Sequence, residues 1–265
     1  MNGVRHFLLA LQFFTRVPVT GPLAGWVGFS PAMLRASAAH FPGVGWLVGA
    51  VGAGVFYLAS TGLPGWAGAL VAAALSTIAT VLMTGAFHED GLADVADGLG
   101  ASADRARALE IMKDSRIGAF GAIALVLALG LKVALLAALA GQGMAHVVLA
   151  LVSAHVLSRL APLFLIRWLP YVGDESAASK SKPLADAIHN GALLVGVAWS
   201  LPAIAWLVTA LGIARGLAPV LLGALAALFM ARLLQRRLRG FTGDGLGATQ
   251  QVCELAIYLA LAWRA

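Results

Sequence analysis

The sequence predicts an all-α, polytopic integral membrane protein: one helical bundle of about seven transmembrane helices, with an N-terminal interfacial helix and a short cytoplasmic helix. Two observations carry this prediction. Hydrophobic residues make up 60% of the 265 residues and charged residues only 11%, and the mean hydropathy is +0.89, far from the composition of a soluble domain. The apolar residues also form long runs between short polar loops, so we expect residues 1–265 to form a single membrane domain.

Residues 1–19 combine a basic residue with a short apolar stretch, as a signal peptide does. Gln12 interrupts this stretch, Arg16 and Pro18 end it, and no small-residue cleavage pattern follows. An amphipathic helix at the membrane interface fits better, because five apolar side chains share one helical face. They are Val4, Phe7, Leu8, Leu11 and Phe14.

Seven apolar runs are long enough to cross a hydrocarbon core of roughly 30 Å. They cover residues 40–61, 66–87, 117–140, 144–169, 191–213, 217–238 and 247–263. In the first run, the glycines of GVGWLVGAVGAG are expected to allow close helix packing, since the segment does not fit a nucleotide-binding P-loop. The single cysteine, Cys253, rules out an internal disulfide.

Basic residues predict the orientation of the bundle. By the positive-inside rule, the loops that carry them are cytoplasmic, as is the amino terminus, and seven spans then place the carboxyl terminus outside. The loop residues are Arg105, Arg107, Lys113, Arg116, Lys180, Lys182, Arg236, Arg237 and Arg239. Because these bases are scattered at helix ends, the net charge of +6 indicates membrane orientation and no nucleic-acid partner.

Residues 87–98, FHEDGLADVADG, concentrate four acids in an otherwise apolar chain. If the second span continues as a helix beyond the membrane surface, Asp90, Asp94 and Asp97 share an arc of about 60°. Glu89 then lies about 100° to one side, where it approaches a neighbouring helix. Like charges roughly 6 Å apart repel by about 3 kcal/mol at an effective dielectric of 20, so a neutralising partner is expected.

A divalent cation is the simplest partner for these acids. A solvated acidic helix end is the alternative, but no lysine or arginine lies between residues 36 and 104 to pair with them. Hard oxygen ligands favour Mg²⁺, with Mn²⁺ as the alternative, over zinc, and the four carboxylates allow one or two such ions. Because Mg²⁺ combines one or two carboxylates with water and phosphate oxygens, the acids point to a phosphorylated substrate.

Residues 102–118 are expected to form the short cytoplasmic helix, with Ser102 as its N-cap. Lys113, Asp114 and Arg116 follow just before the next span, so they face the same cytoplasmic mouth as the acids. Cations in that position can hold phosphate, and an acid there can complete a metal site. The active-site segment is therefore predicted at about residues 88–118.

The glycine-rich turn around Asp244 reaches the same mouth, and Gln250 follows it into a span. Buried polar side chains in a membrane are costly and usually functional, so both are expected in the site. Glu254 suits a site role and hydrogen bonding within the bundle equally well. Lys180 and Lys182 either contact phosphate or only orient the bundle. Of the histidines, none of which shows metal-ligand spacing, His88 is the one to test.

Five segments resemble, in order and spacing, those of the cobalamin synthase family, the adenosylcobinamide-GDP ribazoletransferases. They are FLLALQFFTRVPV, FHEDGLADVADGLG, LEIMKDSRIGAFGA, AHVLSRLAPL and TGDGLGATQQ, from about residue 7 to 255. The resemblance implies a Mg²⁺-dependent enzyme of the inner membrane that acts late in assembly of the nucleotide loop of cobalamin. It implies that adenosylcobinamide-GDP and α-ribazole, or α-ribazole 5′-phosphate, are joined to adenosylcobalamin or its 5′-phosphate, with release of GMP.

The family's motifs fall on residues of this chain without departure. The acidic motif falls on Glu89, Asp90, Asp94 and Asp97, the expected metal ligands. The predicted substrate-binding residues, which include the KDSR and TGD segments, are His88, Lys113, Asp114, Arg116, Lys180, Lys182, Thr242, Asp244 and Gln250. As the hypothesis for the reaction, a ribazole hydroxyl attacks the phosphorus attached to the cobinamide arm, and Asp94 or Asp97 accepts its proton.

Two rival functions are compatible with parts of the sequence. A cation- or proton-coupled transporter places ionisable groups at midspan in repeated halves, but only Glu254 is such a candidate and no repeat is visible. A lipid-forming CDP-alcohol phosphotransferase spaces aspartates similarly, but this chain lacks the full DG, AR, G, D, D pattern of that family. Self-association and association with other enzymes of cobalamin assembly are left open.

Overall fold

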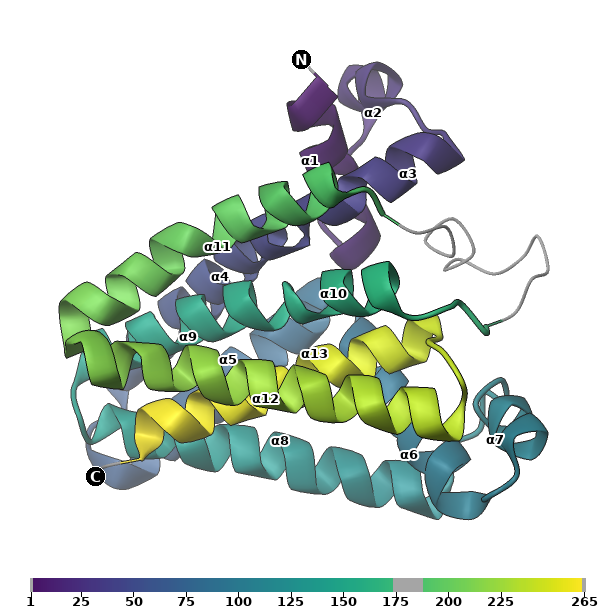
Figure 1. Cartoon of the computed structure of the whole chain (residues 1–265). Helices are drawn as coiled ribbons and strands as arrows, with labels where there is room; N and C mark the ends of the chain where they lie inside the picture. Colours follow the sequence, from purple (N-terminus) through teal and green to yellow (C-terminus); the bar gives the residue numbers. More distant parts are fainter. Residues whose placement is uncertain (1, 174–187, 264–265) are drawn as a thin grey trace.

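The computed structural model describes residues 2–173 and 188–263, and almost all regular structure within them is helical, which confirms the predicted fold class. One isolated β-bridge, between Tyr171 and Phe241, is present in these residues. The long helices lie side by side (Figure 1). One end of the bundle carries the helices α6 (Phe87–Ala101) and α7 (Arg105–Ile111), and the carboxyl terminus lies at the opposite end. We call the first of these the α6–α7 end.

The helices of the bundle agree closely with the predicted apolar runs, one of which is divided into α9 and the short α10. They are α4 (Phe41–Gly62), α5 (Gly65–Thr84), α8 (Ala119–Ala140), α9 (Met144–Ser158), α10 (Ala161–Trp168), α11 (Asn190–Leu211), α12 (Ile213–Arg237) and α13 (Gly243–Ala262). The predicted run 144–169 is interrupted after Ser158, and α10 begins with Pro162 in its first turn, where the missing proline N–H is tolerated.

Six helical segments in the described residues are long and apolar enough to cross a membrane, against the seven predicted. They are Pro31–Gly62, Gly65–Thr84, Ala119–Ala140, Met144–Trp168, Asn190–Leu211 and Ile213–Arg237. The difference is α13, which is as long as α5 but carries Thr249, Gln250, Gln251 and Glu254. These side chains are buried, because α13 packs against α6, α8, α9 and α12. The polarity of α13 therefore faces protein and not lipid.

The N-terminal segment forms α1 (Asn2–Phe14), α2 (Gly21–Val27), α3 (Pro31–Ser37) and the short 3₁₀-helix η1 (Ala38–His40). The predicted helix at residues 1–19 is present as α1. Its buried side packs on the bundle, where the ring of Phe14 meets those of Phe41, Phe87 and His88 at centroid distances of 4.1, 5.6 and 5.9 Å. Val4, which the sequence placed on the same apolar face, is 57% exposed.

Glycines allow α4 to lie directly on α9, as the pattern in residues 43–54 predicts. A methyl group on Gly49 would lie 2.7 Å from the Cα atom of Val152, closer than atoms in contact can approach. The backbones of the two helices therefore touch without intervening side chains.

The second span does not continue as one helix beyond the membrane surface, so that expectation is wrong. α5 ends at Thr84, and Gly85 and Ala86 take left-handed conformations, with φ of 67° and 59°. Left-handed residues end a helix, and α6 starts afresh at Phe87. The backbone N–H of Arg16 donates to the carbonyl of Met83 at 2.7 Å, which ties the segment after α1 to this corner. The predicted spacing of the acids still holds, because all of them lie within α6.

The short helix α7 is shorter than the predicted residues 102–118 and has a different cap. The side chain of Asp104, and not that of Ser102, accepts a hydrogen bond from the Arg107 N–H at 2.8 Å. Ser102 instead accepts a bond from the Asp104 N–H at 3.1 Å. The chain after Ile111 forms turns up to Gly118, so Lys113, Asp114 and Arg116 lie in the loop before α8.

Candidate active site

Three carboxylates converge at the α6–α7 end, where α6 lies along the first turns of α13. A Cβ atom at Gly91 would lie 2.7 Å from the backbone oxygen of Asp244, so the absence of a side chain there lets the two helices approach closely. This approach brings Asp244 beside Asp90 and Asp94, and the charges of these neighbours perturb one another. We call Asp90, Asp94 and Asp244 the acidic cluster.

The electrostatics of the acidic cluster are repulsive. Burial, followed by the charges of Asp244, Asp90 and Asp97, raises the pKa of Asp94 to about 7. Burial, followed by the charge of Asp90, raises the pKa of Asp244 to about 6. Within the described residues, the carboxylates of the cluster take part in no salt bridge and accept no side-chain hydrogen bond. A cation from outside the chain would stabilise them.

The donor chemistry of the acidic cluster fits Mg²⁺ better than a softer metal. Its ligands are hard carboxylate oxygens that lack a cationic partner in the described part of the chain. No group of three or more His, Cys, Asp or Glu side chains in those residues already has a geometry suited to a metal ion. Mg²⁺ requires only one or two carboxylates when phosphate oxygens and water complete its shell. The cluster therefore suits an ion that arrives together with a phosphorylated substrate.

Asp97 lies on the same stripe but is engaged elsewhere. Its carboxylate is 7% exposed and accepts hydrogen bonds from the N–H groups of Gly118 and Gly121, both at 2.8 Å. A side chain at either glycine would collide with this carboxylate. Asp97 therefore caps the N-terminus of α8, where a negative charge is favourable. The sequence did not indicate this contact, and the metal and catalytic roles of Asp97 stay predictions.

Glu89 turns away from the acidic cluster and into the bundle. One carboxylate oxygen, Oε1, accepts a hydrogen bond from Gln251 Nε2 of α13 at 3.0 Å, as expected for an acid that approaches a neighbouring helix. The other oxygen, Oε2, is buried without a hydrogen-bond partner in the described residues. Burial raises the pKa of Glu89. Its role as a metal ligand stays a prediction, because its carboxylate is hydrogen-bonded to Gln251 in the bundle.

The loop before α8 presents two cations and one acid to solvent. Lys113 is exposed, and Arg116 Nη2 lies 2.6 Å from Asp114 Oδ2. Hydrogen bonds from Arg116 lower the pKa of Asp114 to about 2. Asp114 is thus already paired, which leaves Lys113 as the residue of this loop with a free charge. Gly118, which binds Asp97, anchors the loop beside the end of α6.

Thr242 and His88 stabilise the positions of the two helices that carry the acidic cluster, α13 and α6. Thr242 is 4% exposed, and its hydroxyl oxygen caps α13 by accepting a bond from the Gly245 N–H at 3.0 Å. This cap sets the start of the helix that carries Asp244. His88, 4% exposed, stacks on Phe14, and its backbone lies against Gly247. These packing and capping contacts were not anticipated, and substrate binding by either residue stays a prediction.

Gln250 belongs to a set of buried polar side chains deeper in the bundle, which we call the inner polar network. Its members come from α6, α8, α9 and α13 and are Glu89, Lys132, His155, Ser158, Arg159, Gln250, Gln251 and Glu254. Gln250 Nε2 donates to Ser158 Oγ at 2.9 Å and to Glu254 Oε2 at 2.7 Å. Gln251 Nε2 donates to Gln250 Oε1 at 3.0 Å as well as to Glu89, which connects the network to α6.

An ion pair lies at the centre of the inner polar network. Lys132 Nζ is 2.7 Å from Glu254 Oε1, and these side chains are 2% and 1% exposed. His155 Nδ1 lies 3.4 Å from Glu254 Oε2 and 3.0 Å from Arg159 Nη1. The sequence reading missed Lys132, His155 and Arg159. The signal was a charged residue in the interior of each of two otherwise apolar runs: Lys132 within 117–140, and Arg159 within 144–169, where Arg167 lies only near the end.

The predicted site residues thus separate into three places. Asp90, Asp94 and Asp244 come together at the α6–α7 end, with the Lys113 loop nearby. Glu89 and Gln250 lie in the inner polar network, and Asp97, Thr242 and His88 make structural contacts. Lys180 and Lys182 lie outside the described residues.

Comparison with known proteins identifies close relatives. The sequence model described as cobalamin-5-phosphate synthase matches residues 6–262. A protein of Albidiferax ferrireducens named adenosylcobinamide-GDP ribazoletransferase is 60% identical, over 98% of this chain and 98% of its own length. Proteins of the same name from Polaromonas naphthalenivorans and Leptothrix cholodnii are 57% and 48% identical and cover 99% and 98% of this chain, and 99% and 95% of their own lengths. None of the solved structures matches this chain.

Proposed function

The chain belongs to the cobalamin-5-phosphate synthase family, and we propose that it joins adenosylcobinamide-GDP to α-ribazole or α-ribazole 5′-phosphate. The products are adenosylcobalamin or its 5′-phosphate, together with GMP. The protein is an enzyme, a transferase, and its multi-pass helical fold is that of a membrane protein. The printed names of its relatives support the substrates, and the acidic cluster supports the type of chemistry.

The observation that carries the proposal is the acidic cluster without a cationic partner in the described residues. Asp90, Asp94 and Asp244 would hold Mg²⁺, or Mn²⁺, against the diphosphate of the GDP-activated substrate. When bound, the ion supplies electrostatic stabilisation of the charge that builds on the phosphoryl oxygens. Lys113, exposed on the neighbouring loop, adds a cation from the chain itself for the same phosphates.

Proton transfer falls to Asp94 in this proposal. The ribazole hydroxyl oxygen forms a bond to the phosphorus on the cobinamide arm, the bond from that phosphorus to the oxygen of GMP breaks, and the hydroxyl proton passes to the Asp94 carboxylate. Asp94 is chosen because its carboxylate accepts no side-chain hydrogen bond from the described residues, so an oxygen is available to take the proton. Asp97 suits this task less well, because both of its oxygens already accept backbone hydrogen bonds.

We place the α6–α7 end on the cytoplasmic side of the inner membrane. The arginines on the loops and helix ends of this side support that orientation through the positive-inside rule. They are Arg105, Arg107, Arg116, Arg236, Arg237 and Arg239.

The decisive experiment is a reconstituted reaction with the purified full-length protein in detergent. Adenosylcobinamide-GDP and α-ribazole are supplied with Mg²⁺, and the product mass and the released GMP are measured. We expect one GMP for each joined product, loss of both on chelation with EDTA, and recovery with Mg²⁺ or Mn²⁺. Absence of GMP release under all of these conditions would refute the proposal.

The same preparation tests the rival functions. A transporter produces no GMP in detergent, where no transport across a membrane can occur. Pairing of Glu254 with Lys132 also leaves no free carboxylate at the place where a coupling ion would bind in the described bundle. A lipid-forming CDP-alcohol phosphotransferase would release CMP from CDP-diacylglycerol, and we expect none.

A further inference from the structure

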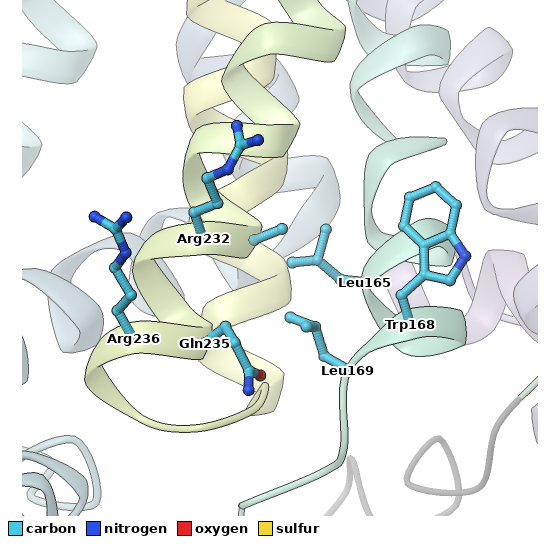
Figure 2. Close-up of a pocket in the computed structure, with 7 residues that line it drawn as sticks. Leu165, Trp168, Leu169, Arg232, Gln235 and Arg236 are labelled. Atoms are coloured by element: carbon cyan, nitrogen blue, oxygen red, sulfur yellow. The ribbon is translucent and has the colours of Figure 1, made fainter.

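A pocket of about 370 Å³ lies between α10 and α12, away from the acidic cluster. Leu165, Trp168 and Leu169 line it from the end of α10, and Ala231, Arg232, Gln235 and Arg236 line it from α12. Figure 2 shows Leu165 and Leu169 extending toward α12, while Arg232 runs along α12 and the Arg236 side chain leaves that helix on the side away from the leucines. The residues that line the pocket thus include apolar side chains of both helices and two arginines of α12.

The position of the pocket matches the level at which lipid headgroups meet the hydrocarbon core. Both walls belong to segments that are apolar enough to span a membrane, Met144–Trp168 and Ile213–Arg237, and the pocket lies at the last turns of each. Trp168 is 68% exposed, and exposed tryptophans at the ends of membrane helices characteristically lie at the interface. A lipid molecule can therefore reach the pocket from the side.

The two arginines of the pocket have charges that no described residue pairs with. Arg232 and Arg236 lie one helical turn apart, are exposed, and form no ion pair or side-chain hydrogen bond with the described residues. Neighbouring arginines of the same end behave differently. Arg237 donates to the carbonyl oxygens of Leu99 and Ser102, at 3.1 and 2.6 Å, and thereby holds α12 against the end of α6.

We propose that this pocket binds an anionic glycerophospholipid. The phosphate of the headgroup pairs with Arg232 and Arg236, and Gln235 offers an amide donor beside them. An acyl chain lies against Leu165, Leu169 and Ala231, because apolar side chains would otherwise face the polar headgroup layer. Basic pockets between membrane helices on the cytoplasmic side are suited to such headgroups. The apolar side chains distinguish a lipid from a free phosphate, which would gain nothing from them.

Native mass spectrometry of the full-length protein in detergent tests the proposal. The protein is titrated with dioleoylphosphatidylglycerol and, separately, with dioleoylphosphatidylcholine. We expect preferential binding of phosphatidylglycerol, and about 30-fold weaker binding of it by the variant R232Q/R236Q, which lacks both charges. The control variant R107Q/R215Q removes two exposed arginines elsewhere and should bind phosphatidylglycerol as the unaltered protein does.

A second variant tests the apolar half of the pocket while keeping its charges. Ala231→Phe fills the space between the two helices, and we expect it to weaken phosphatidylglycerol binding although both arginines remain. Each variant is first shown to be monodisperse and helical, so that the loss reports on the pocket.

Three outcomes would overturn the proposal. The first is equal binding of the two lipids, and the second is an equal loss in R232Q/R236Q and R107Q/R215Q. The third is displacement of the lipid by millimolar inorganic phosphate or GMP with A231F unaffected, which would identify a site for a free phosphate.

Discussion

The carboxylate of Glu254 lies 2.7 Å from Lys132 Nζ, whereas those of Asp90, Asp94 and Asp244 have no cationic partner in the described part of the chain. Both groups of charges lie on α13 and the helices beside it. In the inner polar network the chain supplies the opposite charge itself. In the acidic cluster it does not, and burial together with neighbouring acids raises the pKa of Asp94 and of Asp244.

This difference separates charges that are paired within the bundle from charges that have no partner among the described residues. A buried charge without a partner costs several kcal/mol, so a group deep in the bundle must be paired within the protein. A group at the end of the bundle is open to a cation and a phosphorylated substrate. In the proposed mechanism, a bound Mg²⁺ would relieve the repulsion between its carboxylates. Removal of a charge from the inner polar network should therefore lower the stability of the protein. Removal of a charge from the acidic cluster should instead lower activity and leave stability unchanged.

The largest effect is expected at the acidic cluster, on activity. Asp94→Asn removes the proposed base and a proposed metal ligand, and the rate of GMP release should fall by about 10²–10⁴-fold. Unfolding should not become easier, because a repelling charge has been removed. Glu110→Gln is the matched control, since Glu110 is an exposed acid whose partner is Arg107 on the same short helix. Near-normal turnover by purified D94N would remove Asp94 from the mechanism.

In the inner polar network the large effect is expected on stability. Lys132→Met leaves the Glu254 carboxylate buried without its ion-pair partner, and the free energy of unfolding should fall by about 3–5 kcal/mol. The double variant K132M/E254Q should recover part of this loss, because no unpaired carboxylate then remains. Denaturant unfolding in detergent measures both. The single variant E254Q completes the cycle. If the losses in free energy of unfolding of K132M and E254Q simply add in K132M/E254Q, Lys132 and Glu254 are not coupled.

Asp97 lies on the helix of the acidic cluster, but its carboxylate is hydrogen-bonded within the fold, so it tests whether an acid of α6 serves stability or activity. Asp97→Asn keeps one carbonyl acceptor but loses the second acceptor and the charge at the N-terminus of α8, so the free energy of unfolding should fall by about 1.5–3 kcal/mol. Asp90→Asn, on the same helix and without such bonds, should lose none. Comparison of the two variants in the GMP assay then shows whether Asp97 contributes to chemistry beyond its cap. A D97N protein as stable as the unaltered one would contradict the capping role.

The smallest effect is a dependence of stability on pH and Mg²⁺. The folded-state pKa values of Asp94 and Asp244, about 7 and about 6, lie above the ordinary value of 3.8. At these two carboxyls the folded protein holds more protons than the unfolded chain between about pH 4 and 7, so their contribution to stability should decrease as pH rises through this window. Without divalent cations, these two carboxyls should contribute more to the thermal midpoint at pH 5 than at pH 7.5, whereas burial lowers the pKa of His88 and this acts in the opposite direction.

Mg²⁺ provides the comparison for this pH dependence. It should raise the thermal midpoint more at pH 7.5, where the carboxylates are ionised, than at pH 5. The variant D94N/D244N should lose the contribution of the two carboxyls to the pH profile, so its thermal midpoint should fall more at pH 5 than at pH 7.5 relative to the unaltered protein, and its response to Mg²⁺ should be smaller. An identical response in that variant would mean that Mg²⁺ binds elsewhere.

Much of the architecture was predictable because it depends on neighbours in the chain. The spacing of Asp90, Asp94 and Asp97 on one helix, the lengths of the apolar runs and the close-packing glycines of α4 all follow from local periodicity. The cytoplasmic orientation of the loops and the site segments were inferred from residue type and order alone, and both stay predictions. The break at Gly85 and Ala86 was missed, since left-handed turns depend on how the two helices dock around Arg16.

The sequence by itself determined a polytopic helical bundle and the concentration of acids near one end, because composition and helical period need no tertiary partner. Only the tertiary structure decided which acids act together. It places Asp244 beside Asp90 and Asp94. It also places the Asp97 carboxylate as a cap on the N-terminus of α8 and buries Lys132 against Glu254. The physical reason is that a charge is stabilised by whichever group lies a few ångströms away, and in a bundle that group comes from another helix.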